Sequence, residues 1–179
     1  MTWAINILEL VTILSLISST PIALPPGLAK ANIYLNVHSA VFVAEALLSV
    51  SSTILRVSSY RHLGRFFTYQ LSIRSGHKLV TDGPYRIVRH PGYTALCAFL
   101  LGDVLCQLGP GSVWAQLGLW RNPVCCGIGL MQTCLAAYVG FVVSVLRVPK
   151  EDGILREQFK DEWEVWAKKT PCKLIPFVY

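Results

Sequence analysis

Four long apolar runs alternate with polar segments along the chain, at residues 3–24, 33–55, 91–108 and 123–146. A helix needs about 20 residues, each rising about 1.5 Å, to cross a bilayer, so three runs are long enough and the third is short. Pro91 and Pro123 open the last two runs, and proline fits the first turn of a helix because no hydrogen bond is lost there. We therefore expect an all-α integral membrane protein with about four transmembrane helices.

The first run has no basic segment before it and no small-residue cleavage motif after it, so we expect a retained helix and not a signal peptide. Hydrophobic residues make up 53% of the chain and charged residues only 15%, against about 25% in soluble domains. The net charge of +6 comes from basic residues that lie beside the apolar runs. This placement favours contacts with membrane lipids over nucleic-acid binding.

The basic residues also predict an orientation in the membrane. All Lys and Arg except Lys30 and Arg121 lie in residues 56–90 or 147–173. The positive-inside rule therefore places the middle loop and the C-terminal tail in the cytosol. We expect an N-terminal transmembrane hairpin over residues 1–55 and a core over 56–179. The core would comprise a cytosolic loop (56–90), two transmembrane helices (91–108 and 123–146), and an interfacial helix and tail (147–179).

Six cysteines are present, five of them inside apolar runs, and none forms a C-x-x-C pair. We expect small buried hydrophobic residues, with no zinc site and no disulfide framework.

In the tail, Leu155, Phe159, Trp163 and Trp166 follow a helical spacing and predict one apolar stripe. The first interpretation is a helix lying on the membrane with its tryptophans at headgroup depth. The second makes the same helix a lid over a site formed by the middle loop.

The loop at 56–90 is long, basic and rich in turns, with turn signals at Gly76, at residues 82–84 and at residues 90–92. Tyr85 and Tyr93 are suited to stacking on a heteroaromatic ring or facing a cation. His77 and His90 are suited to hydrogen bonding or proton transfer. Taken singly, these residues are more typical of a structural histidine and of an aromatic belt at the membrane boundary than of a functional site.

Directly after the fourth run, Arg147 and Glu151 are four residues apart and share a face if the helix continues. This pair suits a site that holds a carboxylate with Arg147 and an ammonium with Glu151, although a surface ion pair has the same spacing. Pro149 opposes a straight continuation of the helix.

Taken together, these motifs resemble the isoprenylcysteine carboxyl methyltransferases, which are membrane enzymes of the endoplasmic reticulum. The resemblance covers roughly residues 56–179. The matching elements are Gln70, His77-Lys-Leu-Val80, Gly83-Pro-Tyr85, Arg89-His-Pro-Gly-Tyr93, Asn122-Pro-Val-Cys125, Arg147-x-x-x-Glu151-Asp152, Pro171 and Leu174-Ile-Pro-Phe177. Two departures are Gly92, where serine is common, and Glu151-Asp152 in place of a Glu-Glu pair.

The resemblance implies methyl transfer from S-adenosyl-L-methionine to the C-terminal carboxylate of the prenylated cysteine of CaaX proteins. It further implies a multi-pass protein of the endoplasmic reticulum membrane with its active site facing the cytosol. Arg147 would meet the substrate carboxylate. The cofactor would contact Gln70, His77, Lys78, Leu79, Val80, Tyr85, His90, Pro91, Gly92, Tyr93 and Glu151.

This chemistry needs neither a metal nor a general base, because a carboxylate is already ionised at pH 7. We therefore expect His77 and His90 to bind and shape the site. Methylation of the amine of phosphatidylethanolamine is an alternative, but it requires an anionic headgroup site and a route for proton loss, and Arg147 favours an anionic acceptor. A sterol reductase and a non-catalytic membrane scaffold are further alternatives.

Overall fold

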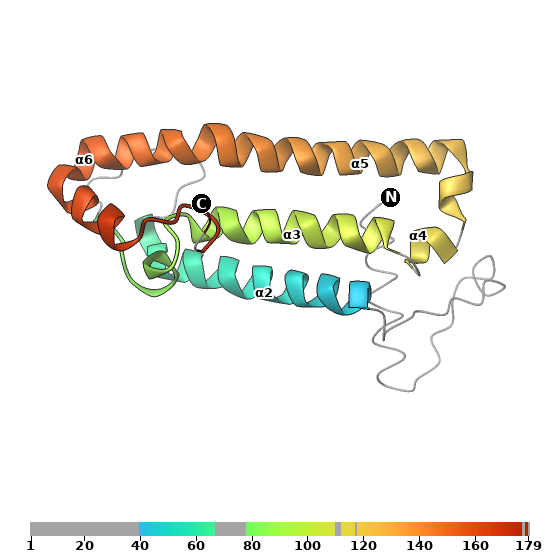
Figure 1. Ribbon diagram of the computed structural model, residues 1–179, viewed down its shortest axis with the longest axis horizontal. Coiled ribbons are helices and arrows are strands. Elements are labelled where there is room, and N and C mark those ends of the chain that lie inside the picture. Colours follow the sequence, from blue (N-terminus) through green and yellow to red (C-terminus); the bar gives the residue numbers. More distant parts are fainter. Residues whose placement is uncertain (1–39, 67–77, 110–111, 117, 177, 179) are drawn as a thin grey trace. The chain divides into compact units, whose positions relative to one another are not determined.

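The computed structural model describes residues 40–66, 78–109, 112–116, 118–176 and 178. Every regular element in these ranges is helical, which confirms the all-α prediction for the described part (Figure 1). The elements are α2 (Ala40–Leu63), η1 (Gly64–Phe66), η2 (Gly83–Arg86), α3 (Pro91–Leu108), α4 (Val113–Gln116), η3 (Leu119–Arg121), α5 (Pro123–Phe141), η4 (Val142–Arg147) and α6 (Val148–Lys169).

Within the described residues, two helical runs are long and apolar enough to cross a membrane: Pro91–Leu108, and the continuous run Pro123–Lys169 that comprises α5, η4 and α6. Only 22% and 17% of their most apolar windows are buried inside the protein. The expected span at 3–24 lies outside the described residues. In the second expected span, the described helix α2 passes residue 55 and ends at Leu63.

The predicted loop therefore begins later than residue 56. Polar side chains near the end of α2 bond to the backbone of their own helix: the Ser59 hydroxyl donates to the Leu55 carbonyl at 2.7 Å, and His62 Nδ1 lies 2.8 Å from the Ser58 carbonyl. These bonds satisfy polar groups without ending the helix. The end of the apolar run was thus a poor guide to the end of the helix.

Both prolines open a helix as predicted. Asn122 caps α5, because its side-chain oxygen accepts hydrogen bonds from the N–H groups of Val124 at 3.0 Å and Cys125 at 3.2 Å. The cysteines are less buried than expected: all six are free thiols, five are half-buried and Cys134 is exposed. The physical reason is that they lie mostly on apolar helices whose outer faces are uncovered by protein.

The chain divides into two compact units, which are described separately. In the unit that includes residues 101–136, four polar side chains join α3 to α5. The Gln132 amide donates to Asp103 at 2.7 Å, the Gln107 amide donates to the Gln132 oxygen at 3.1 Å, and the Thr133 hydroxyl donates to the Gln107 oxygen at 3.4 Å. Amide and hydroxyl contacts of this kind hold apolar helices in register where hydrophobic burial cannot.

The second unit contains residues 48–100 and 137–179, and in it the helix passes through Pro149 without a break. A proline inside a helix lacks an N–H donor and crowds the carbonyl four residues before it. Here the π-helix η4 precedes α6, and the Val148 N–H donates to the Val143 carbonyl five residues back. The wider π-helical turn accommodates the proline, and the helix carries Arg147 and Glu151 on as one element.

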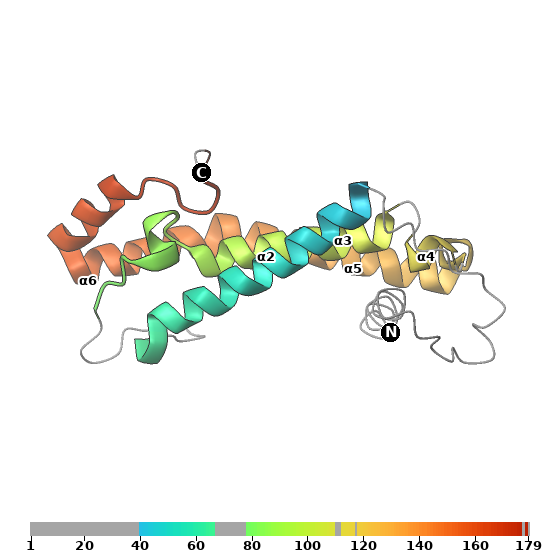
Figure 2. The same ribbon diagram turned by 90° about the horizontal axis from the view of Figure 1, so that it is seen from below.

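The main change of direction occurs at Lys160, which has φ 44° and ψ −113°. This residue divides α6 into two helical pieces, and the second piece folds back beside the segment that contains η2 (Figure 2). Trp163 and Trp166 are consequently only 8% and 5% exposed and pack with Tyr85, joined by Leu155 and Phe159. The four residues of the predicted stripe do gather in one apolar cluster, but the interpretation that places the tryptophans at headgroup depth is wrong, because the kink turns them into the core.

Replacing Lys160 with glycine is expected to stabilise the protein by about 1 kcal/mol, because glycine adopts positive φ without the steric cost of a Cβ atom. Thermal unfolding of detergent-solubilised protein, followed by near-UV circular dichroism, measures the change. Lys168→Gly is the matched control: this lysine is exposed and helical, so its replacement should cost about 0.5–1 kcal/mol. A loss of stability in Lys160→Gly as well would contradict the strained conformation.

Candidate active site

The site is framed by two backbone contacts between the start of α3 and the C-terminal tail. The Arg89 N–H donates to the Cys172 carbonyl at 2.9 Å, and the His90 N–H donates to the Lys173 carbonyl at 3.0 Å. One turn later, the Thr94 hydroxyl donates to the Leu174 carbonyl at 2.6 Å. The tail thereby fixes the backbone that carries Arg89 and His90.

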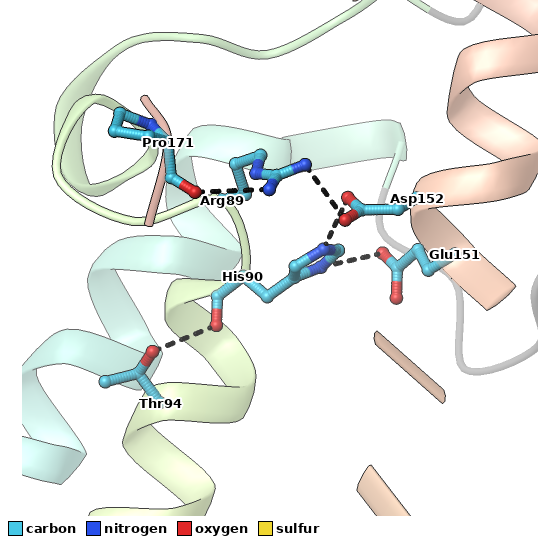
Figure 3. A network of polar contacts seen from close by, with 6 residues as sticks. All are labelled: Arg89, His90, Thr94, Glu151, Asp152 and Pro171. Atoms are coloured by element: carbon cyan, nitrogen blue, oxygen red, sulfur yellow. Dashed lines mark hydrogen bonds and ion pairs between the residues drawn. The ribbon is translucent and has the colours of Figure 1, made fainter. Parts of the chain in front are cut away.

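Arg89 joins three parts of the second unit (Figure 3). Its Nη1 donates to Asp152 Oδ2 at 2.9 Å, and its Nη2 donates to the Pro171 carbonyl at 3.2 Å. Its guanidinium carbon lies 5.5 Å from the centre of the Trp163 ring. The side chains of Arg89 and Asp152 are 9% and 11% exposed, so this is a buried ion pair in which both charges are hydrogen-bonded.

His90 lies between two neighbouring carboxylates of α6 (Figure 3). Its Nε2 is 2.9 Å from Asp152 Oδ1, and its Nδ1 is 4.0 Å from Glu151 Oε1. The ring stacks on Tyr93, with centroids 5.9 Å apart and planes inclined by 25°. Because the side chain is 3% exposed and held on one nitrogen, it is built to shape the site.

Glu151 and Arg147 both lie close enough to the Tyr93 phenol for their charges to act on it. Arg147 is exposed, and the Glu151 side chain is 31% exposed. The helix does continue from Arg147 through Glu151, which is the condition under which the two residues were expected to share a face.

Tyr85, which lies in η2, contributes the third aromatic ring of the site. Its backbone carbonyl accepts a hydrogen bond from the Trp166 indole at 3.2 Å. Burial raises the pKa of the Tyr85 phenol above its ordinary value, and the nearby Glu151 carboxylate and the Tyr60 and Tyr93 phenols raise it further. The ring therefore stays neutral at physiological pH. Three tyrosines grouped near one carboxylate form a surrounding suited to a cation.

The structure brings together five of the predicted site residues, namely Tyr85, His90, Tyr93, Arg147 and Glu151. Other predicted residues lie differently. Leu79 and Val80 pack against the hydrophobic cluster of Tyr85, Trp163 and Trp166, and Lys78 is exposed. Pro91 is buried at the first turn of α3. Gly92 faces Tyr60, and a Cβ atom there would lie at 3.9 Å, an ordinary contact that leaves room for serine. Gln70 and His77 lie outside the described residues.

Sequence reasoning assigned no role to Arg89, Asp152 or Tyr60. Arg89 precedes His90 in the sequence and Asp152 follows Glu151. Their opposite charges next to predicted site residues could have indicated an ion pair. Tyr60 had no signal, since it lies in α2 and far from the motifs. Among the residues that the structure describes, no group of three His, Cys, Asp or Glu side chains is arranged to hold a metal ion.

These elements define a class of protein: an all-helical chain with helices apolar enough to cross a membrane and a charged, tyrosine-lined site next to them. Residues 45–121 match the model of the isoprenylcysteine carboxyl methyltransferase family. The chain is 34% identical over 161 residues to protein-S-isoprenylcysteine O-methyltransferase A of Arabidopsis thaliana, covering 89% of this chain and 68% of that protein. The chain belongs to the isoprenylcysteine carboxyl methyltransferase family.

Two further relatives agree. Protein-S-isoprenylcysteine O-methyltransferase B of Arabidopsis thaliana is 30% identical over 128 residues, which cover 70% of this chain and 54% of the relative. A probable protein-S-isoprenylcysteine O-methyltransferase of Oryza sativa subsp. indica is 29% identical over 135 residues, which cover 74% of this chain and 59% of the relative. The chain thus spans less than two thirds of the length of these two relatives.

Proposed function

We propose that this protein transfers a methyl group from S-adenosyl-L-methionine to the C-terminal carboxylate of a prenylated cysteine in CaaX-processed proteins. Family membership and the names of the relatives support the reaction class. The observation that carries the proposal is that Arg147 and Glu151 both lie close to the Tyr93 phenol, because this places a guanidinium and a carboxylate near one ring at the start of an apolar helix.

The residues present fit the methyl donor. S-adenosyl-L-methionine supplies an electrophilic methyl group on a positively charged sulfur and also carries an ammonium group. Glu151, with the aromatic rings of Tyr85 and Tyr93 near it, offers a negative charge and electron-rich faces to such cations. We propose that these residues and His90, with Gln70 and His77 from the sequence motif, hold the donor.

Arg147 is proposed to bind the acceptor carboxylate. Its exposed guanidinium can pair with both oxygens of a carboxylate and so orient it. The chain does not need to supply a base, because the carboxylate is ionised at neutral pH. Holding the two reactants in line in a site drier than bulk water then provides most of the acceleration.

The membrane supplies the route for the lipid part of the substrate. We propose four transmembrane helices in the endoplasmic reticulum membrane with the site facing the cytosol, in agreement with the basic residues at 56–90 and 147–173. The prenyl chain would remain among apolar side chains and lipid. Each buried CH₂ group contributes about 0.8 kcal/mol, so this contact supplies much of the substrate affinity.

The direct test incubates the purified full-length chain in lipid nanodiscs with methyl-labelled S-adenosyl-L-methionine and N-acetyl-farnesylcysteine. Base-labile label on the lipid indicates a methyl ester and supports the proposal. Label on added phosphatidylethanolamine would replace it with amine methylation. Transfer to neither acceptor, by protein that is folded by circular dichroism, would favour a non-catalytic scaffold.

Replacing Glu151 with glutamine is expected to weaken binding of S-adenosylhomocysteine and S-adenosyl-L-methionine, the latter about 10- to 100-fold. The loss corresponds to one charge-assisted contact of about 1.5–3 kcal/mol and should be larger for the cationic donor. Isothermal titration calorimetry measures both affinities. Glu157→Gln, at an exposed position of α6, is the control and should bind like the wild type. Unchanged affinity in Glu151→Gln would exclude Glu151 from the donor site.

A further inference from the structure

Asp152 contacts two partners with its two oxygens. One oxygen accepts from the Arg89 guanidinium and the other lies on His90 Nε2, each at 2.9 Å. All three residues are less than 9% exposed. A carboxylate held in this way cannot rotate without losing one of two buried partners, so the direction of its lone pairs is fixed.

We propose that Asp152 is a positioning residue that sets the tautomer of His90 and thereby the chemical character of the nitrogen facing Glu151. This inference rests on the proposed function, because it concerns how His90 hydrogen-bonds within the proposed donor site. A carboxylate has no proton to give, so the proton of the shared hydrogen bond lies on Nε2. In the neutral ring the other nitrogen, Nδ1, which is 4.0 Å from Glu151 Oε1, is then the acceptor.

Arg89 fixes the orientation of the Asp152 carboxylate on which the tautomer of His90 depends. Its guanidinium holds one oxygen of Asp152 and is itself held by the Pro171 carbonyl and by the Trp163 ring. With that oxygen engaged, the second oxygen has His90 as its hydrogen-bond partner. The tail and the folded-back end of α6 thus determine, through Arg89 and Asp152, which ring nitrogen of His90 carries the proton.

Asparagine at 152 inverts this arrangement. Its side-chain amide has one oxygen and one NH₂ group. Because the charged guanidinium of Arg89 can only donate, it hydrogen-bonds to the oxygen. The NH₂ group then faces His90 Nε2, which must become the acceptor, so the proton moves to Nδ1. An Nδ1–H group would no longer accept a ligand donor and would compete for the Glu151 carboxylate, and both effects weaken binding of a cationic donor.

A purely structural ion pair makes a different prediction. It would lower the stability of the Asp152→Asn protein, but it would change neither the tautomer nor the Michaelis constant of the folded fraction. Glutamate keeps two equivalent oxygens one methylene further out, so Asp152→Glu should preserve the tautomer. Asp161→Asn, an exposed aspartate of α6, controls for the loss of one charge.

The experiment uses full-length protein in nanodiscs with ¹⁵N-labelled histidine, of which the chain has four, and assigns His90 from the His90→Gln spectrum. We expect wild type, Asp152→Glu and Asp161→Asn to show a protonated Nε2 and a bare Nδ1, and Asp152→Asn to show the reverse. The KM for S-adenosyl-L-methionine should rise at least tenfold in Asp152→Asn, change by less than threefold in the other two variants, and exceed any change in kcat.

A wild-type His90 protonated on Nδ1, or on both nitrogens, would overturn the inference even if no variant folds. So would an Asp152→Asn protein with an unchanged tautomer or an unchanged KM. Failure of the proposed function is separate: wild type that transfers no methyl group refutes the reaction, while the nuclear magnetic resonance spectra still decide the role of Asp152.

Discussion

Replacing Arg147 with alanine is expected to reduce methyl transfer to N-acetyl-farnesylcysteine by at least 100-fold, while binding of S-adenosyl-L-methionine changes less than threefold. A bidentate contact between guanidinium and carboxylate contributes about 3 kcal/mol or more, which corresponds to that factor. Arg147 is exposed, so its removal should leave folding intact. Glu151, Tyr85 and Tyr93, which are proposed to hold the donor, are unchanged in this variant, which is why the donor should still bind.

Single-turnover transfer of labelled methyl, combined with calorimetric binding of the donor, separates the two effects. Lys150→Ala removes an exposed positive charge three residues away and should retain wild-type turnover. Arg147→Lys keeps the charge but loses the planar fork, so we expect an intermediate rate. Turnover within threefold of wild type in Arg147→Ala would remove this residue from the acceptor site.

The second large effect is one of stability. Arg89→Ala is expected to destabilise the folded protein by about 3–5 kcal/mol, because Asp152 would remain buried without its cation. The Pro171 carbonyl would lose a donor at the same time. For a chain of this size, such a loss lowers the melting temperature by about 10 °C or more, which differential scanning fluorimetry of the detergent-solubilised protein can record.

Two variants test the cause of that loss. Arg86→Ala removes an exposed arginine from the same segment and should cost less than about 0.5 kcal/mol. Arg89→Met combined with Asp152→Leu removes both charges, so it should be more stable than Arg89→Ala alone. If Arg89→Ala unfolds at the wild-type temperature, the ion pair does not support the fold.

The starts of α3 and α5 could be predicted because proline has a fixed φ and lacks an N–H donor, two local properties that any sequence displays. The ends of helices were harder. Residues after 55 in α2 look polar, yet their side chains bond to their own helix, so the change in hydropathy did not coincide with a change in structure.

The kink at Lys160 had no local signal, since lysine normally favours helices. Its conformation is consistent with the packing of Trp163 and Trp166 around Tyr85, and such long-range packing outweighs local preference. The same reason explains the misjudged apolar stripe: spacing shows which residues share a face, but not whether that face meets lipid or protein.

The candidate site divides in the same way. Short motifs predicted His90, Tyr93, Arg147 and Glu151 as functional residues, and the structure brings these four together. The contacts of Arg89 with Asp152 and Pro171 join positions 63 and 82 residues apart. Residue spacing predicts contacts only between residues within a few helical turns. Contacts over 63 or 82 residues depend instead on the path of the whole helix.

The contacts of Arg89 and His90 with the tail also impose an order of assembly. A ribosome delivers α3 well before α6, so Arg89 and His90 emerge long before Asp152 and Lys173, which they contact in the folded protein. The site can therefore close only after residues 152–173 have been synthesised. A chain interrupted before residue 170 would contain the apolar helices but would leave Arg89 without its Pro171 contact, so we expect such a product to be less stable than the uninterrupted chain.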